Sequence, residues 1–136
     1  RQDPRGEAGV VAIFSRKMLA GETPTVFGDG EQTRDYVYAG DVARAFLLAL
    51  RAKPGIYNIG TGRESSVNDL VREIGRRTRY AGRVEYGPPV AGEVRRSCLD
   101  CRRAGEALGW KSRVKLGDGL ARTVAWFKNR PRRPSR

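Results

Sequence analysis

A basic and an acidic side chain stand next to each other at Arg34 and Asp35, within the run VFGDGEQTRDYVYAGDV that covers residues 26–42. A guanidinium presents a planar fork of N–H donors, which matches the oxygens of a diphosphate. Asp35 is placed to hold either this guanidinium or the adjoining turn. The sequence therefore predicts an anion site at Arg34, and an ordinary surface ion pair between these neighbours is the alternative.

The residues that the chain lacks narrow its chemistry. It has no histidine, so a His-based catalytic triad is excluded within this sequence. Its two cysteines form a single CxxC, at Cys98 and Cys101. A structural zinc takes four N or S ligands, so we predict no metal site and two reduced, partly buried thiols in a cytoplasmic protein. A redox dithiol at the start of a helix is the alternative.

The sequence also lacks the usual signatures of dinucleotide chemistry. It contains no GxGxxG and no P-loop, the glycine-rich turns that bring backbone N–H groups against a pyrophosphate. None of its five tyrosines is followed four residues later by lysine, the pairing that would activate a tyrosine base. We therefore predict no catalytic residue and no cofactor-binding residue in this segment.

Composition bounds the remaining possibilities. The 136 residues suit one domain, and 27 basic against 15 acidic side chains give a formal charge of +12. Residues 61–136 hold 19 basic and 8 acidic side chains, which admits a nucleic-acid surface. Solvated helix faces are the alternative that we favour, since no nucleic-acid motif accompanies the charge. Residues 129–136 predict a basic, disordered tail, and no apolar run is long enough to span a membrane.

Periodicity predicts helices separated by short extended pieces, hence a compact mixed α/β lobe over residues 1–128. Extended pieces are expected at residues 25–27, 36–38, 56–59 and 84–86. Gly28-Asp29-Gly30 and Gly60-Thr61-Gly62 supply turns, because glycine accepts a positive φ cheaply.

The helices are predicted from caps and apolar spacing. One runs from about Glu7 to Ala20, one begins at Asp41 as its N-cap, and one follows a Ser66–Asp69 capping box. A short helix capped by Asp100 stops at Gly109, and a last one contains Leu120, Val124 and Phe127. The side chains expected to pack inward from the second helix are Val42, Ala45, Phe46, Ala49 and Leu50.

Several motifs occur together in one order: RQDP, FGDGEQTRDYVY, NIGTG, SVNDLV, GEVRRS, LGW and GLARTVAWF. In this order they resemble the C-terminal substrate lobe of extended short-chain dehydrogenases, the NAD-dependent nucleotide-sugar epimerases and dehydratases. The resemblance is greatest to the UDP-glucose 4-epimerases. It implies that a Rossmann lobe upstream of Arg1 holds NAD and the catalytic tyrosine and lysine, and that the longer protein is a homodimer.

The resemblance also implies roles for individual residues. Arg34 would bind the pyrophosphate, and the backbone of Thr25, Val26 and Phe27 would contact a uracil edge. Val11 and Phe14 would wall the nucleotide, with Asp35 supporting the site. For Phe27, Val11 and Phe14, a role in the core alone explains the residue types equally well.

One position departs from the family pattern. Val90 stands where the family usually has an arginine that clamps the diphosphate, before Gly92-Glu93. An apolar side chain cannot neutralise phosphate, and Arg95 or Arg96 would replace the clamp only after a shift of the loop.

These features predict the nucleotide-sugar-binding part of an NAD-dependent UDP-sugar 4-epimerase, inactive by itself. The substrate lobe of a nucleotide-sugar 4,6-dehydratase or decarboxylase is the alternative within the family. A basic nucleic-acid-binding module is the alternative from another class.

Overall fold

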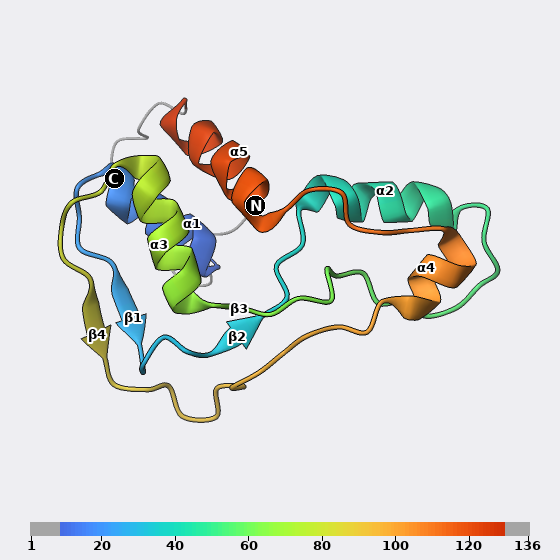
Figure 1. Cartoon of the computed structure of the whole chain (residues 1–136), viewed down its shortest axis with the longest axis horizontal. Helices are drawn as coiled ribbons and strands as arrows, with labels where there is room; N and C mark the ends of the chain where they lie inside the picture. The colour runs from blue at the N-terminus through green and yellow to red at the C-terminus, as the bar shows by residue number, and fades with distance from the viewer. Residues whose placement is uncertain (1–8, 130–136) are drawn as a thin grey trace, which may run out of the picture.

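The computed structural model describes residues 9–129 and contains short strands interleaved with helices (Figure 1). The helices in this range are α1 (Val10–Leu19), α2 (Ala39–Ala49), α3 (Val67–Thr78), α4 (Arg102–Leu108) and α5 (Leu116–Lys128). The strands in this range are β1 (Thr25–Phe27), β2 (Thr33–Arg34), β3 (Ser65–Ser66) and β4 (Glu85–Gly87). The predicted small mixed α/β class is confirmed.

The strands form two separate pairs. β1 runs parallel to β4, with Val26 opposite Tyr86, and β2 runs antiparallel to β3, with Arg34 opposite Ser65. Residues 95–97 run beside β2, because the Thr33 N–H donates to the Arg95 carbonyl and the Ser97 N–H donates to the Thr33 carbonyl. This late segment of the chain therefore lies along the strand that carries Arg34.

The main core lies where α1, α3 and α5 pack together and β1 approaches them (Figure 1). As the spacing predicts, Phe14 and Met18 of α1 are buried, and Leu70 and Ile74 of α3 are fully enclosed. Each fully buried aliphatic side chain contributes roughly 1.5 to 3 kcal/mol. The core therefore fixes the positions of α1 and β1, the two elements that flank the cavity described below.

The start of α3 has the predicted capping box. The Asp69 N–H donates to Ser66 Oγ at 3.1 Å, and the Ser66 N–H donates to Asp69 Oδ2 at 2.9 Å. These two bonds satisfy N–H groups that the helix itself leaves unpaired. They also place Val67 at the head of the buried face of α3.

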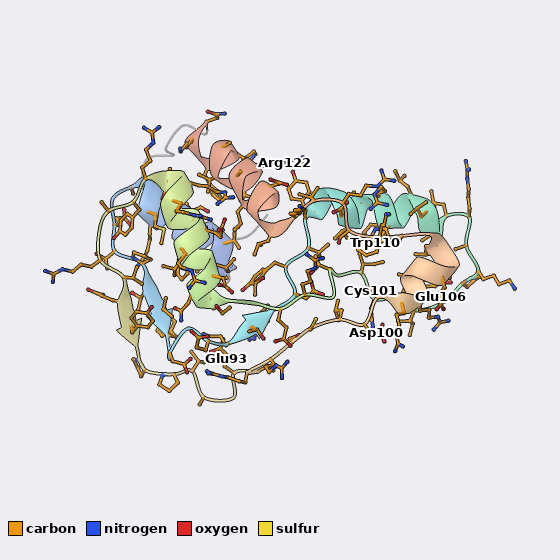
Figure 2. The ribbon with its side chains drawn as sticks, viewed as in Figure 1. Glu93, Asp100, Cys101, Glu106, Trp110 and Arg122 are labelled. Atoms are coloured by element: carbon orange, nitrogen blue, oxygen red, sulfur yellow. The ribbon has the colours of Figure 1, made fainter. Side chains whose placement is uncertain are left out.

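A second, smaller core joins α2 to α4. Its buried members are Ala45, Ala104, Leu108 and Trp110. Trp110 lies beside α2 and α4, and its indole N–H donates to the Asp41 carbonyl at 3.0 Å (Figure 2). The buried apolar side chains thus form two clusters rather than one continuous core.

Two predictions about α2 are wrong. Asp41 lies inside the first turn, after the N-cap Tyr38, and its carboxylate accepts the backbone N–H groups of Arg113 and Val114 at 2.8 and 2.9 Å. It ties the segment before α5 to α2 instead of capping a helix. Phe46, Ala49 and Leu50 are exposed, because α2 turns Ala45 and Leu48 toward the second core.

The extended pieces are also partly different from those predicted. Residues 36–38 form no strand, and the strand in that part of the chain is β2, just before them. β4 begins one residue later than predicted. Residues 56–59, which were predicted to be extended, belong to no strand and no helix.

Other local predictions have mixed outcomes. Gly109 ends α4 with φ +61°, as expected, but the N-cap is Cys101, and Asp100 instead accepts the Arg102 N–H. Cys101 is partly buried, whereas Cys98 is exposed, and both are free thiols. Glu7, the predicted start of the first helix, and residues 130–136 of the predicted tail lie outside the described residues. Between residues 9 and 129, no helix combines the length and the apolar character that crossing a membrane requires.

Candidate functional site

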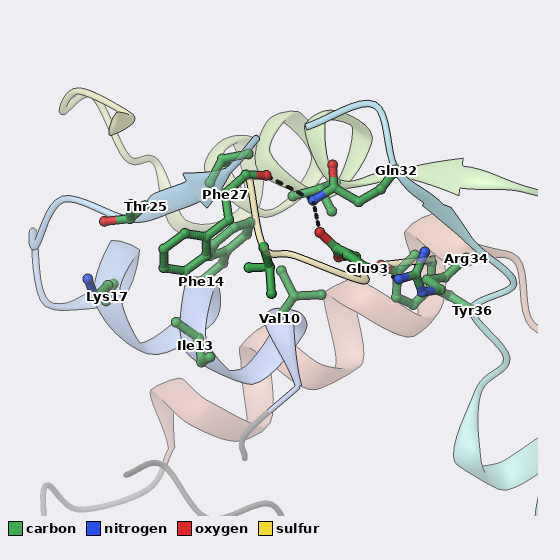
Figure 3. Close-up of a pocket in the computed structure, with 13 residues that line it drawn as sticks. Val10, Ile13, Phe14, Lys17, Thr25, Phe27, Gln32, Arg34, Tyr36 and Glu93 are labelled. Carbon is green, nitrogen blue, oxygen red and sulfur yellow. Dashed lines mark hydrogen bonds and ion pairs between the residues drawn. The ribbon is translucent and has the colours of Figure 1, made fainter. Parts of the chain in front are cut away.

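A cavity of about 360 Å³ opens between α1 and β1 and extends to β2 and the loop at residues 90–93 (Figure 3). Of the eight site residues predicted from the sequence, Phe14, Thr25, Val26, Phe27 and Arg34 line it. The structure therefore brings together five residues that span two strands and one helix.

One end of the cavity is aromatic and apolar. Phe14 forms part of its wall from the buried side, whereas Phe27 is 51% exposed and stands over the opening. Lys17 borders the same end, where its ammonium donates to the Thr23 carbonyl at 3.1 Å. An aromatic face beside hydrogen-bonding groups is a suitable environment for a flat heterocyclic base.

The backbone of β1 adds polar groups along this end. β4 takes one edge of β1, since Glu85 N–H donates to the Pro24 carbonyl and Gly28 N–H donates to the Gly87 carbonyl, both at 3.0 Å. Successive residues of a strand direct their backbone groups to opposite edges, so those of Thr25 and Phe27 face away from β4. The Phe27 carbonyl already accepts Gln32 Nε2 at 3.0 Å. The N–H groups of Thr25 and Phe27 and the Thr25 carbonyl remain on this edge, as two donors and one acceptor without a backbone partner among the described residues.

The opposite end of the cavity carries Arg34 and Glu93 (Figure 3). Arg34 Nη1 donates to the carbonyls of Val94 at 2.6 Å and Thr33 at 2.8 Å, and Nη2 lies 3.4 Å from Glu93 Oε1. These contacts hold the guanidinium at the cavity mouth, with its side chain 32% exposed. A partly exposed cation held in this way can bind an anion without first being ordered.

Glu93 connects the two ends. Its carboxylate accepts Gln32 Nε2 at 3.4 Å, and the same nitrogen donates to the Phe27 carbonyl (Figure 3). Gln32 is buried, so this side chain fixes the distance between β1 and the loop that carries Glu93. Tyr36 also lines this end, where burial raises the pKa of its phenol above the ordinary value.

Asp35 does not line the cavity. Its carboxylate accepts the Thr61 N–H at 2.7 Å, the Thr61 hydroxyl at 2.5 Å and the Gly62 N–H at 2.9 Å. Burial alone would raise the pKa of Asp35, but the hydrogen bonds from Thr61, Gly62 and Leu99 outweigh it and lower the pKa. Asp35 thus steadies the 60–62 turn, one of the two roles considered for it, and fixes the backbone next to Arg34.

Two other predicted residues also lie outside the cavity lining. Val11 is partly buried against the main core, while its neighbour Val10 and Ile13 line the cavity. Arg95 makes two hydrogen bonds with Asp29, at 2.7 and 2.8 Å. These bonds, together with the one from the Glu31 N–H, lower the pKa of Asp29 to about 2. Val90 lines the cavity in the position where an arginine was expected.

Gln32, Glu93 and Lys17 line the cavity but were not predicted from the sequence. Gln32 could have been found, because it lies two residues before Arg34. Lys17 shares a helix face with Phe14 at a spacing of three residues. Glu93 had no local signal, since its proximity to Arg34 depends on pairing across 59 residues.

None of α2 to α5 begins on a glycine-rich turn directly after a strand, which is how a helix N-terminus receives a pyrophosphate. Among residues 9–129, no group of three or more His, Cys, Asp or Glu side chains is arranged to hold a metal ion.

Comparisons with family models, curated proteins and solved structures all point to one family. Residues 1–60 match the NAD dependent epimerase/dehydratase family. The putative UDP-glucose 4-epimerase of Methanocaldococcus jannaschii is 52% identical over 97% of this chain and 43% of its own length. The Thermotoga maritima UDP-glucose 4-epimerase structure, solved with UDP-glucose, is 51% identical and superposes with a TM-score of 0.91 over 94% of this chain and 42% of its own.

A more distant relative has a different activity. The Escherichia coli dTDP-glucose 4,6-dehydratase 1 is 33% identical over 87% of this chain and 36% of its own length. The chain thus spans less than half the length of each of these relatives. The ordered motifs, the mixed α/β fold and these similarities together show that the chain belongs to the NAD-dependent epimerase/dehydratase family.

Proposed function

We propose that residues 1–128 form the nucleotide-sugar-binding lobe of an NAD-dependent UDP-sugar 4-epimerase. In this proposal a separate Rossmann lobe supplies NAD and the catalytic side chains, and the complete protein is a cytoplasmic homodimer. The lobe described here anchors the nucleotide. Binding energy gathered at the nucleotide positions a distant sugar carbon, so a lobe without catalytic side chains still raises the rate.

The observation that carries the proposal is the polarity of the cavity between α1 and β1. Its aromatic end offers the Phe27 N–H and the Thr25 carbonyl, which complement the O4 acceptor and N3–H donor of uracil. Its other end holds Arg34, whose remaining N–H groups suit a diphosphate. A nucleoside diphosphate likewise has a base at one end and an anion at the other, joined by a sugar.

A second candidate within the family is the substrate lobe of a 4,6-dehydratase or a decarboxylase. The dehydratase of E. coli supports it at 33% identity, against 52% and 51% for the two 4-epimerases. The residues that distinguish these reactions act on the sugar, so they belong to the other lobe in this proposal. Thymine and uracil share the edge that β1 would contact, so only the 5-methyl group and the ribose 2′-hydroxyl can make UDP and dTDP bind differently. Tighter binding of UDP than of dTDP would argue against a dTDP-sugar dehydratase, but it would not distinguish an epimerase from a UDP-sugar decarboxylase.

The test is a calorimetric titration of the chain with UDP, UDP-glucose and dTDP, repeated for Arg34→Ala. A charge-assisted hydrogen bond contributes roughly 1.5 to 3 kcal/mol, so the variant should bind UDP about 10- to 100-fold more weakly. The matched control is Arg102→Ala, which removes an arginine with an 85% exposed side chain on α4. Equal UDP affinity in wild type and Arg34→Ala would overturn the anchoring role.

Salt dependence separates this proposal from the nucleic-acid alternative. Binding of the basic chain to an oligonucleotide should fall by orders of magnitude between low and moderate salt, because counterions are released. UDP in the cavity carries few charges and should lose far less affinity. Tight oligonucleotide binding at moderate salt, together with no UDP binding, would favour the alternative.

A further inference from the structure

A second hollow, with a volume of about 510 Å³, lies where α3 and the end of α1 meet the segment that leads from α3 to β4 (Figure 1). It shares no lining residue with the cavity between α1 and β1. Sites for small molecules have volumes of roughly 300 to 1,000 Å³, so this hollow is large enough for one. The proposed function gives it no role.

The floor of the hollow is apolar. Val71, Tyr80 and Val84 pack against the main core on one side and line the hollow on the other. Met18, which is buried, contributes to the floor from α1. Part of the outer layer of the main core therefore remains accessible here, and a ligand with an apolar body gains free energy by covering it.

Two glycines leave the space open. Gly75 lies in the interior of α3, where glycine lowers helix stability, yet a Cβ at this position would meet no atom within 4 Å. A Cβ at Gly82 would collide with the Tyr80 phenol. Because residue 82 has no side chain, the Tyr80 hydroxyl reaches the Arg83 carbonyl, to which it donates at 2.8 Å. The Tyr80 ring is thus fixed as a wall of the hollow before any ligand binds.

The rim of the hollow is basic. Arg72 and Arg76 line it from successive turns of α3, with side chains 68% and 72% exposed. Arg72 pairs with Asp69, and Arg76 pairs with Glu73, which also lines the hollow and shares its charge with Arg77. Ion pairs at exposed positions contribute little free energy, so the anionic group of a ligand can compete for both guanidinium groups.

The segment that follows adds more positive charge beside the hollow. Residues 72–83 contain five arginines and one glutamate. Arg79 and Arg83 are exposed on either side of Tyr80, and neither forms an ion pair with another residue of the range 9–129. An anion that approaches this part of the surface therefore meets a positive potential, which attracts it.

We propose that this hollow binds a small aromatic anion, a planar ring that carries a phosphate or carboxylate group. The ring lies against Tyr80 and the apolar floor, and the anionic group accepts hydrogen bonds from Arg72 and Arg76. A nucleic-acid strand is disfavoured, because it needs several aromatic side chains along a basic groove, and Tyr80 is the one aromatic residue of the described range that lines the hollow. The inference does not depend on the proposed function.

The test is an NMR titration of the isotope-labelled chain with naphthyl phosphate. Inorganic phosphate and naphthol, the two halves of this probe, are titrated separately. Naphthyl phosphate should shift the amide signals of residues 71–84 and bind about tenfold or more tightly than either half, because one molecule then makes both kinds of contact. The signals of residues 25–34 report separately on binding in the cavity between α1 and β1.

Substitutions separate the hollow from general attraction by charge. Gly75→Leu fills the space and should abolish the shifts, while its higher helix propensity keeps the unfolding temperature at or above that of wild type. Arg72→Gln combined with Arg76→Gln should weaken binding of naphthyl phosphate about 10- to 100-fold. The matched control is Arg102→Gln combined with Arg103→Gln, which removes two exposed arginines of α4 and should leave this affinity unchanged.

Each remaining outcome would overturn the proposal. Equal affinity of wild type and the Arg72/Arg76 variant would show that these side chains do not hold the anion. Equal affinity for inorganic phosphate and naphthyl phosphate would mean that surface charge alone attracts the probe. Unfolding of the chain by Gly75→Leu would show that its own fold needs this space. Tighter binding of a single-stranded oligonucleotide, with shifts that extend over α4 and α5, would instead identify a nucleic-acid surface.

Discussion

The carboxylate of Glu93 lies 3.4 Å from the guanidinium of Arg34, and the two side chains are exposed to nearly the same extent, 31% and 32%. This pair lies at the end of the cavity where a diphosphate would bind. An incoming anion must therefore share the Arg34 guanidinium with the Glu93 carboxylate or displace that carboxylate. The affinity of the site for phosphate is then set by the balance between these two residues.

Replacing Glu93 with glutamine should strengthen UDP binding about twofold to fivefold, because a partly exposed ion pair is worth up to about 1 kcal/mol. The amide oxygen still accepts the bond from Gln32, so the loop should keep its position. Titration calorimetry with UDP measures the change, and Asp100→Asn, outside the cavity lining, is the control. Weaker binding by Glu93→Gln would mean that the carboxylate itself contacts the nucleotide.

Val90→Arg should add a second arginine to the cavity, beside Arg34. Val90 lines the cavity and is 53% exposed, so a longer side chain has room to reach the diphosphate. One added charge-assisted hydrogen bond predicts about tenfold tighter UDP binding. Val94→Arg adds the same charge at a residue that is 58% exposed and does not line the cavity. An equal gain in both variants would mean that net charge, and not position, is responsible.

Gly60→Ala should weaken the hydrogen bonds that Thr61 and Gly62 donate to the Asp35 carboxylate. A Cβ at residue 60 would lie 2.5 Å from Asp35 Oδ2, and the hydrogen bonds from Thr61 and Gly62 prevent that carboxylate from moving away. We expect a loss of about 1 to 3 kcal/mol in the free energy of unfolding, measured with urea. Gly75→Ala in α3 meets no atom within 4 Å and should be neutral or slightly stabilising. Equal stabilities of the two variants would contradict the close approach.

Acid should weaken the attachment of α2 to the segment before α5. Burial acts to raise the pKa of Asp41, but the N–H groups of Val114 and Arg113 and the Arg44 guanidinium outweigh it and lower the pKa. A lowered pKa in the folded state adds stability that is complete above the unfolded value of about 3.9 and is lost as the pH falls through the folded value.

Asp41→Asn should therefore reduce the free energy of unfolding at pH 6 and make it depend less on pH below about 4. Urea unfolding at pH values of about 6, 4 and 3 measures this, and Glu106→Gln at an exposed position of α4 serves as the control. A variant whose stability followed pH in the same way as wild type would show that Asp41 is not the titrating group.

The fold and the site were predictable where the determining contacts are local. The Ser66–Asp69 box lies within one helical turn, and Arg34 and Phe27 lie in a single run. Phe46 was assigned to the core wrongly, because an apolar stripe shows that a helix has a buried face but not which neighbour covers it. Glu93 was not found at all, since β-type pairing near Thr33 brings it to Arg34 from far along the chain.

The parallel pairing of β1 with β4 has a consequence for biosynthesis. Thr25 to Phe27 leave the ribosome some 60 residues before their partners, residues 85–87, and before the loop that ends at Glu93. Until then β1, the strand that would contact the base, lacks β4, the strand with which it pairs. If the proposed function holds, a nascent polypeptide should acquire affinity for a nucleotide only after residue 93 has emerged, and products truncated before it should lack that affinity.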